Sequence, residues 1–226
     1  MDASYLQQSP QGDKLAHISD YYADCFKALV DVDLPPSRRR PSLELPDEMG
    51  ARMGSWLSRQ KAEMGLMENA ATLLVNPYST TRKRDMSLAQ LHQVLQVWHA
   101  SEEKRLSVVS VSPHQFEDMQ AWLAERPELK HTLVFTARDS IFELICLIAL
   151  AQQVVSAETA IIHFANALDI PLLALMRQKT KHWAPMANGR TQVLYAPESS
   201  WVQEIDTSLI SERMRHPVYA SANHEA

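Results

Sequence analysis

Residues 154–175 read VVSAETAIIHFANALDIPLLAL, and this stretch decides the fold. An apolar, partly β-branched run is followed by a segment with helical spacing and then by a second apolar run led by Pro171. Because both apolar runs are continuous rather than alternating, each is typical of a strand buried on two faces. The stretch therefore predicts a strand, a helix and a second strand parallel to the first.

The same alternation continues on both sides of this stretch. Further strands are expected at residues 72–76, 106–111, 132–135 and 192–195, and further helices at residues 87–100, 115–125, 140–152 and 201–214. Ser140 followed by Glu143 has the spacing of a capping box at the start of a helix. This strict alternation predicts an α/β fold with a Rossmann-like, doubly wound parallel sheet at about residues 66–212.

The N-terminal part has a different pattern. Residues 17–32 have helical spacing with an apolar stripe, formed by Tyr21, Phe26, Leu29 and Val30. Prolines then predict an extended connector, and a polar amphipathic helix is expected at residues 48–61. We divide the chain into an N-terminal segment (1–48), an α/β domain (49–212) and a flexible tail (213–226).

Composition excludes several classes of protein. A net charge of −5 and a pI near 6.0 give no sign of a nucleic-acid binder. The two cysteines, Cys25 and Cys146, lie far apart, so neither a disulfide framework nor a zinc cluster is expected. The most apolar window, residues 142–151, is about half as long as the roughly 20 residues that span a bilayer. No signal peptide opens the sequence, and we expect a cytoplasmic protein.

Two loops are candidates for a ligand site, because ligands of such sheets bind at the carboxyl ends of the strands. The loop at residues 76–84 contains three hydroxyl residues, Ser79, Thr80 and Thr81, followed by three cations that end with Arg84. Hydroxyls and guanidinium groups both donate hydrogen bonds to phosphate oxygens. The alternative is a polar surface loop with helix-capping serines.

The second candidate loop starts at Ser156 and opens a helix. Thr159 is the expected N-cap, and the free N–H groups and the dipole at a helix N-terminus favour a diphosphate. Glu158 could accept hydrogen bonds from sugar or ribose hydroxyls, or could simply favour the positive end of the dipole. His163, one turn into the helix, is either a functional group or a packed, hydrogen-bonded histidine.

Some motifs are absent from the sequence. None of its five glycines lies in a strand-to-helix turn, which excludes a dinucleotide fingerprint and a Walker loop. It also has no Asp-x-Asp pair to hold a metal on a diphosphate and no Gly-x-Ser-x-Gly elbow. We therefore expect neither a bound metal nor a cofactor.

In chain order, these motifs resemble those of the heptosyltransferases, inverting glycosyltransferases of lipopolysaccharide core assembly. The motifs are Ser-Thr-Thr-x-x-basic at residues 79–84, Pro-His-x at 113–115 and Val-Val-Ser-x-acidic-Thr-small-x-x-His at 154–163. The resemblance covers residues 15–212. It implies the C-terminal, donor-binding domain of a two-domain (GT-B) glycosyltransferase, with residues 1–48 as a remnant of the first domain.

The resemblance also implies a set of donor-binding residues. Gln115 would contact the nucleoside, and Asp139 would make a further donor contact. The block at residues 158–163 would hold the diphosphate and sugar of ADP-heptose. The full set is Ser79, Thr80, Thr81, Arg84, Gln115, Asp139, Glu158, Thr159, Ala160, Ile161 and His163. Four of these depart from the family's usual Lys, Glu, Asp and Gly, namely Arg84, Gln115, Glu158 and Ala160, and the departures indicate an altered donor preference or a weakened site.

The implied function is metal-independent, inverting transfer of a sugar, a heptose from ADP-heptose, to a lipopolysaccharide core acceptor. Arg84 would stabilise the leaving diphosphate. The catalytic base is unknown and is expected in a first domain that this chain lacks, so the chain alone is expected to be inactive unless a partner chain carries that domain. At most peripheral contact with the inner membrane is expected. The alternatives are a non-catalytic nucleotide-binding fragment or subunit, and a domain whose site has decayed.

Overall fold

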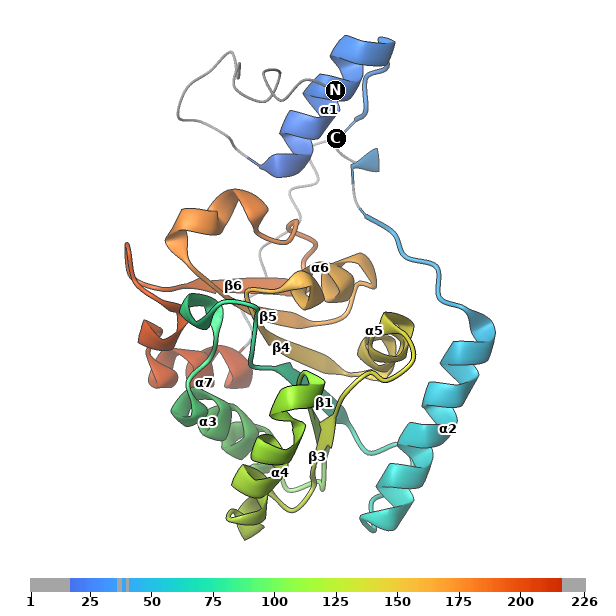
Figure 1. Cartoon of the computed structure of the whole chain (residues 1–226), viewed down its shortest axis with the longest axis vertical. Coiled ribbons are helices and arrows are strands. Elements are labelled where there is room, and N and C mark those ends of the chain that lie inside the picture. Colours follow the sequence, from blue (N-terminus) through green and yellow to red (C-terminus); the bar gives the residue numbers. More distant parts are fainter. Residues whose placement is uncertain (1–16, 36–37, 40, 217–226) are drawn as a thin grey trace.

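The computed structural model describes residues 17–35, 38–39 and 41–216. Its centre is a six-stranded sheet in the order β3-β2-β1-β4-β5-β6, in which all neighbours are parallel (Figure 1). The strands are β1 (Thr72–Asn76), β2 (Leu106–Ser110), β3 (Thr132–Phe135), β4 (Gln153–Ala157), β5 (Leu172–Met176) and β6 (Thr191–Tyr195). The strand order reverses between β1 and β4, so the doubly wound topology is confirmed and its switch point lies between these two strands.

Helices cover both faces of the sheet (Figure 1). One face carries α3 (Leu88–His99), α4 (Phe116–Ala124) and α7 (Thr207–Arg215); the other carries α2 (Asp47–Glu63), α5 (Ile141–Leu150) and α6 (Ala160–Ala167). In β1, Leu73 and Val75 pack into the first core and Leu74 into the second. Burial on both faces is the reason why the strands are continuously apolar in sequence.

The predicted helix at residues 201–214 is wrong as a single element. The chain forms a short 3₁₀ turn, η7 (Val202–Glu204), and then α7. Ile205 between them is extended (φ −67°, ψ 126°), and Asp206 caps α7 by accepting a hydrogen bond from the Ser208 N–H at 2.7 Å. Helix α7 runs to Arg215, past the expected boundary at residue 212, and residues 217–226 lie outside the described residues.

The capping box expected at Ser140 is wrong in part, because only one of its two hydrogen bonds forms. Ser140 does cap α5, because its hydroxyl accepts a hydrogen bond from the Phe142 N–H at 3.2 Å. Glu143, however, accepts from the Arg138 N–H at 2.7 Å and pairs with Arg52 of α2. It therefore links α5 to α2 instead of closing the cap.

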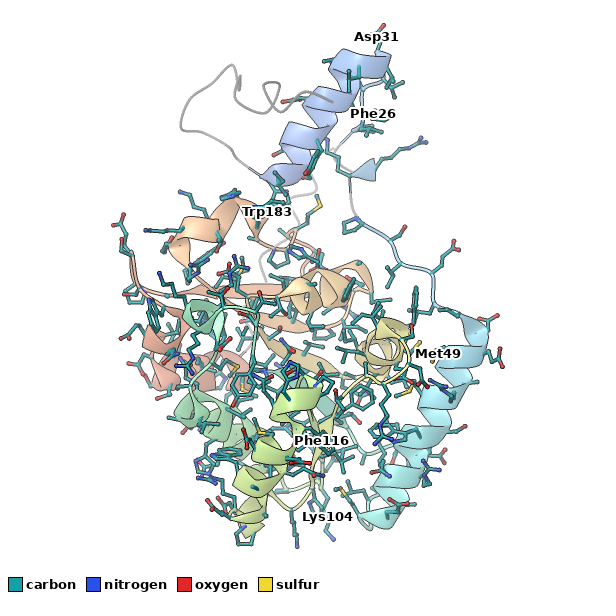
Figure 2. The ribbon with its side chains drawn as sticks, viewed as in Figure 1. Phe26, Asp31, Met49, Lys104, Phe116 and Trp183 are labelled. Carbon is teal, nitrogen blue, oxygen red and sulfur yellow. The ribbon has the colours of Figure 1, made fainter. Side chains whose placement is uncertain are left out.

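The first helix, α1 (Ile18–Val30), lies apart from the sheet at the end of an extended connector (Figure 1). Figure 2 shows Phe26 on this helix, well away from the sheet. Three residues of the predicted apolar stripe are exposed, namely Phe26, Leu29 and Val30. The side chains of Tyr21 and Cys25 lie outside the described part of the structure.

Where α1 begins, the His17 ring (Nε2) is 2.7 Å from the Ala184 carbonyl oxygen. This contact joins the start of α1 to the segment after β5. Among the described residues, no helix is both long enough and apolar enough to cross a bilayer.

Candidate functional site

Asn76, the last residue of β1, bridges the switch point of the sheet. Its side chain is 8% exposed, and its Nδ2 donates to the Thr159 hydroxyl at 3.1 Å, to the Ser156 hydroxyl at 3.4 Å and to the Tyr78 carbonyl at 3.2 Å. The loop after β1 and the start of α6 are thereby held together. Sequence reasoning did not single out Asn76, although a polar residue that ends an apolar strand was a usable signal.

Thr159 caps α6, as predicted. It is extended (φ −141°, ψ 177°), and its hydroxyl accepts a hydrogen bond from the Ile161 N–H at 3.2 Å. Ala160 is exposed, whereas the Ile161 side chain is buried in the core below. The predicted site residue Ala160 can therefore offer only its backbone N–H to a ligand, and the N–H of Ile161 is already bonded to Thr159.

The loop at residues 77–85 is closed by its own polar groups. Asp85 accepts a hydrogen bond from the Ser79 N–H at 2.7 Å. The Ser79 hydroxyl donates to the Thr81 carbonyl at 2.9 Å and accepts from the Thr81 N–H at 3.0 Å. Ser79 therefore organises the loop, while Thr80 and Thr81 are exposed and Arg84 is half-buried at the end of a 3₁₀ turn, η3 (Arg82–Arg84).

Glu158 is only 6% exposed and has guanidinium groups on two sides. Its Oε2 accepts hydrogen bonds from the N–H of Arg177 at 3.1 Å and from its Nε at 3.2 Å, while its Oε1 accepts from Nη2 of the same residue at 3.3 Å. The Nε of Arg84 is 3.2 Å from Oε1, but its N–H is not aligned for a hydrogen bond. Arg177 directly follows β5, and sequence reasoning missed it because no motif marks it.

These contacts determine the charge of Glu158. Burial alone would raise the pKa of the carboxyl group, but hydrogen bonds from the side chain and backbone of Arg177 and from the Thr180 side chain, together with the charge of Arg177, outweigh burial. The pKa is held below its usual value of 4.5. The carboxylate is therefore ionised at neutral pH.

His163, one turn after Thr159, is half-buried. Burial, together with the nearby His17, lowers the pKa of its imidazole below the usual 6.5. His163 is therefore largely neutral at pH 7, so it can donate or accept a hydrogen bond but supplies no fixed positive charge.

Gln115, the predicted nucleoside contact, and Asp139, predicted to make a further donor contact, lie elsewhere along the edge of the sheet. The Gln115 Oε1 accepts from the Ser112 hydroxyl at 2.7 Å and from the Ser112 N–H at 3.3 Å, so this side chain caps the turn before α4. Asp139 is exposed, with its carboxylate 3.7 Å from Nη1 of Arg52. Their contacts are with these neighbours and not with the cluster at the switch point, which consists of Asn76, Arg84, Glu158, Thr159 and Arg177.

A groove of about 940 Å³ follows the edge strand β3 between α2 and α4. Its lining includes Trp56, Phe116 and Phe135, and Arg138 at the carboxyl end of the strand. Figure 2 shows Phe116 at the start of α4. Neither Glu158 nor Thr159 lines this groove, so the groove and the polar residues at the switch point are separate places.

Comparisons with known proteins bear on the whole α/β domain. Residues 102–208 match the model of glycosyltransferase family 9 (heptosyltransferase). A search of the curated proteins finds no match. Among solved structures, the glycosyl transferase family 9 protein of Veillonella parvula superposes with a TM-score of 0.73 at 14% identity, covering 89% of this chain and 60% of that one.

Two Escherichia coli structures are also similar. ADP-heptose LPS heptosyltransferase II gives a TM-score of 0.60 at 16% identity, covering 81% of this chain and 55% of that one. Heptosyltransferase WaaC with ADP-2-deoxy-2-fluoro heptose gives 0.59 at 14% identity, covering 91% and 57%.

Identities this low show a shared fold, and the chain spans only 55–60% of the length of these three proteins. The family match includes Glu158, Thr159 and His163 but not the loop at residues 79–84. The expected resemblance is thus confirmed: over residues 102–208 the chain is similar to glycosyltransferase family 9, the heptosyltransferases, and it has the Rossmann-like fold of their solved structures.

Proposed function

We propose that this chain is the donor-binding part of a glycosyltransferase and that the cluster at the switch point receives the diphosphate of a nucleotide sugar. The observation that carries the proposal is the Asn76–Thr159 hydrogen bond, which joins the hydroxyl- and arginine-bearing loop to the N-terminus of α6. Both sides of this junction favour anions: the helix through its dipole and free N–H groups, the loop through Arg84. The family match at residues 102–208 supports the choice of a nucleotide sugar.

The proposed roles follow from exposure and existing contacts. Thr80 and Thr81 are exposed and donate hydroxyl hydrogen bonds to phosphate oxygens, and the Ala160 N–H does the same from the helix. Arg84 balances the negative charge that grows on the leaving diphosphate during transfer. The proposal assigns this role to Arg84 and the helix dipole rather than to a metal ion.

The donor and acceptor are taken from the family. We propose ADP-heptose as the donor and lipopolysaccharide core as the acceptor. Gln115 contacts the nucleoside, Asp139 makes a further donor contact and His163 acts as a neutral hydrogen-bonding group. Gln115 must release Ser112 before it can contact a nucleoside. We assign the catalytic base to no described residue.

Calorimetry with ADP and with adenosine, each with and without EDTA, tests the proposal. ADP should bind without metal and more tightly than adenosine, because the phosphates are bound by the cluster. Arg84→Ala should remove most of this difference. Arg82→Ala, at an exposed cation on the same 3₁₀ turn, is the matched control and should remove little of it. Absence of ADP binding, or binding that disappears in EDTA, would contradict the proposal.

A binding module without its own chemistry is the second candidate, and one observation favours it. The carboxylate of the cluster, Glu158, is engaged with arginines, and Asp85 of the neighbouring loop accepts a hydrogen bond from the Ser79 N–H. Neither is free to take a proton from an acceptor hydroxyl. Turnover of an ADP-sugar by this chain would exclude this candidate.

A further inference from the structure

Arg177 uses only part of its hydrogen-bonding capacity on Glu158. A guanidinium group carries five N–H donors. The Nε and Nη2 of Arg177 each give one to the Glu158 carboxylate, so two on Nη1 and one on Nη2 remain on the opposite edge of the group. The side chain is 16% exposed, so it is mostly fixed by packing yet still reaches the surface.

The group formed by Glu158, Arg177 and Arg84 has a net positive charge. The single carboxylate of Glu158 faces both Arg177 and Arg84, each with its Nε 3.2 Å from a carboxylate oxygen. One negative charge against two positive ones leaves an excess of one positive charge. The positive end of the α6 dipole begins at the next residue, Thr159, and adds to this excess.

The sheet brings these groups together from three neighbouring strands. Arg84 follows β1, Glu158 follows β4 and Arg177 follows β5, and the sheet order places β4 between the other two. In the register of β4 and β5, Ala157 pairs with Leu175, so Glu158 and Arg177 leave adjacent strands at nearly the same level. The guanidinium groups of Arg84 and Arg177 therefore reach the Glu158 carboxylate from the strands on either side of β4.

We propose that Arg177 is a second cationic ligand of the donor diphosphate and that Glu158 is a positioning residue, which holds Arg177 and Arg84 in place instead of binding the sugar. This inference rests on the function proposed above. It also explains why Glu stands here in place of the family's shorter Asp. The Glu158 carboxylate reaches both the backbone N–H and the side chain of Arg177.

The test compares Arg177→Gln with Lys179→Gln, a change at an exposed cation two residues further along the same segment. Affinities for ADP and adenosine are measured by calorimetry in EDTA. Loss of a charged hydrogen bond should weaken ADP binding roughly 10- to 100-fold in Arg177→Gln. Adenosine affinity should change less than about threefold, and the same holds for ADP binding by Lys179→Gln, as expected for an exposed charge.

Each outcome of this experiment supports or overturns the role of Arg177 as a ligand of the diphosphate. A selective loss of ADP affinity supports the inference. Equal losses for ADP and adenosine mean that Arg177 is only structural and overturn it, and so does unchanged ADP affinity. If the wild-type protein binds no ADP, the proposed function itself fails. If the wild-type protein binds ADP and Arg177→Gln binds it equally well, only the inference about Arg177 fails.

A measurement on the wild-type protein covers the case in which Arg177→Gln does not fold. The side-chain N–H resonances of Arg177 should shift when ADP is added and stay in place when adenosine is added. Resonances that respond equally to both compounds, or to neither, would overturn the inference.

Discussion

Replacing Glu158 by Gln should destabilise the protein substantially, because it removes the negative charge that two arginines share. Glu158 is 6% exposed and the Arg177 side chain 16%, so solvent screens this pair weakly. Breaking a buried pair costs about 3–5 kcal/mol. Gln retains an acceptor, and the Arg84 side chain is 38% exposed and can turn to water, so we expect a loss of about 2–4 kcal/mol.

Chemical denaturation at pH 7 measures this loss, with Glu63→Gln as the matched control. Glu63 lies 4.0 Å from Arg59 on the surface of α2, and its replacement should change stability by less than about 0.5 kcal/mol. For a chain of this size, the Glu158 variant should also melt roughly 4–16 °C lower. A loss for Glu158→Gln no larger than that of the control would refute the assignment of Glu158 as a buried anchor for both arginines.

The pH dependence gives an independent check on the same variant. The folded-state pKa of Glu158 lies below 4.5, so the ionised group contributes its stability above the unfolded-state pKa, and this contribution is lost as the pH falls through the folded-state pKa. The difference between wild type and Glu158→Gln should therefore shrink below about pH 4.5. A difference that stays constant in acid would contradict the ion-pair explanation.

Three further predictions concern single residues. Arg84→Ala should weaken ADP binding by about 1.5–3 kcal/mol and leave adenosine binding unchanged by calorimetry; equal losses would exclude Arg84 as a phosphate ligand. Thr159→Ala should lower the free energy of unfolding by about 1 kcal/mol through loss of the N-cap, and Thr159→Ser should preserve it; identical denaturation curves for the two variants would argue against the cap. Burial lowers the pKa of His99 to about 4, so stability should fall as the pH drops from 6.5 towards 4, and an NMR titration of this imidazole with a midpoint above 6 would contradict this.

Much of the fold could be predicted from local sequence pattern. The bounds of β1 and β3 were predicted without error, since each is a short apolar run, although Leu133 and Val134 of the edge strand β3 are only half-buried. The break between η7 and α7 could not be predicted in this way. Buried Gln90 of α3 donates to the carbonyls of Val202 at 3.0 Å and Ile205 at 2.7 Å, and such distant partners leave no mark on the local spacing.

In the candidate site too, local features were predictable from the sequence and contacts between distant residues were not. The N-cap role of Thr159 depends on its own helix and was therefore predictable. The pairing of Asn76 with Thr159 spans 83 residues of sequence, and Glu158 meets Arg177 only because β4 and β5 are neighbours in the sheet. Sequence could indicate which loops lie at the carboxyl edge, but not that Glu158 is buried there between two guanidinium groups.

The most direct test of the account is the map of backbone amide shifts that ADP produces in an NMR titration of the wild-type protein. We predict that the largest changes occur at residues 79–84 and 158–161 and at Arg177, because the phosphates are bound at the switch point of the sheet. Changes confined to the groove along β3, or no changes at saturating ADP, would contradict the central claim that this cluster is a diphosphate site.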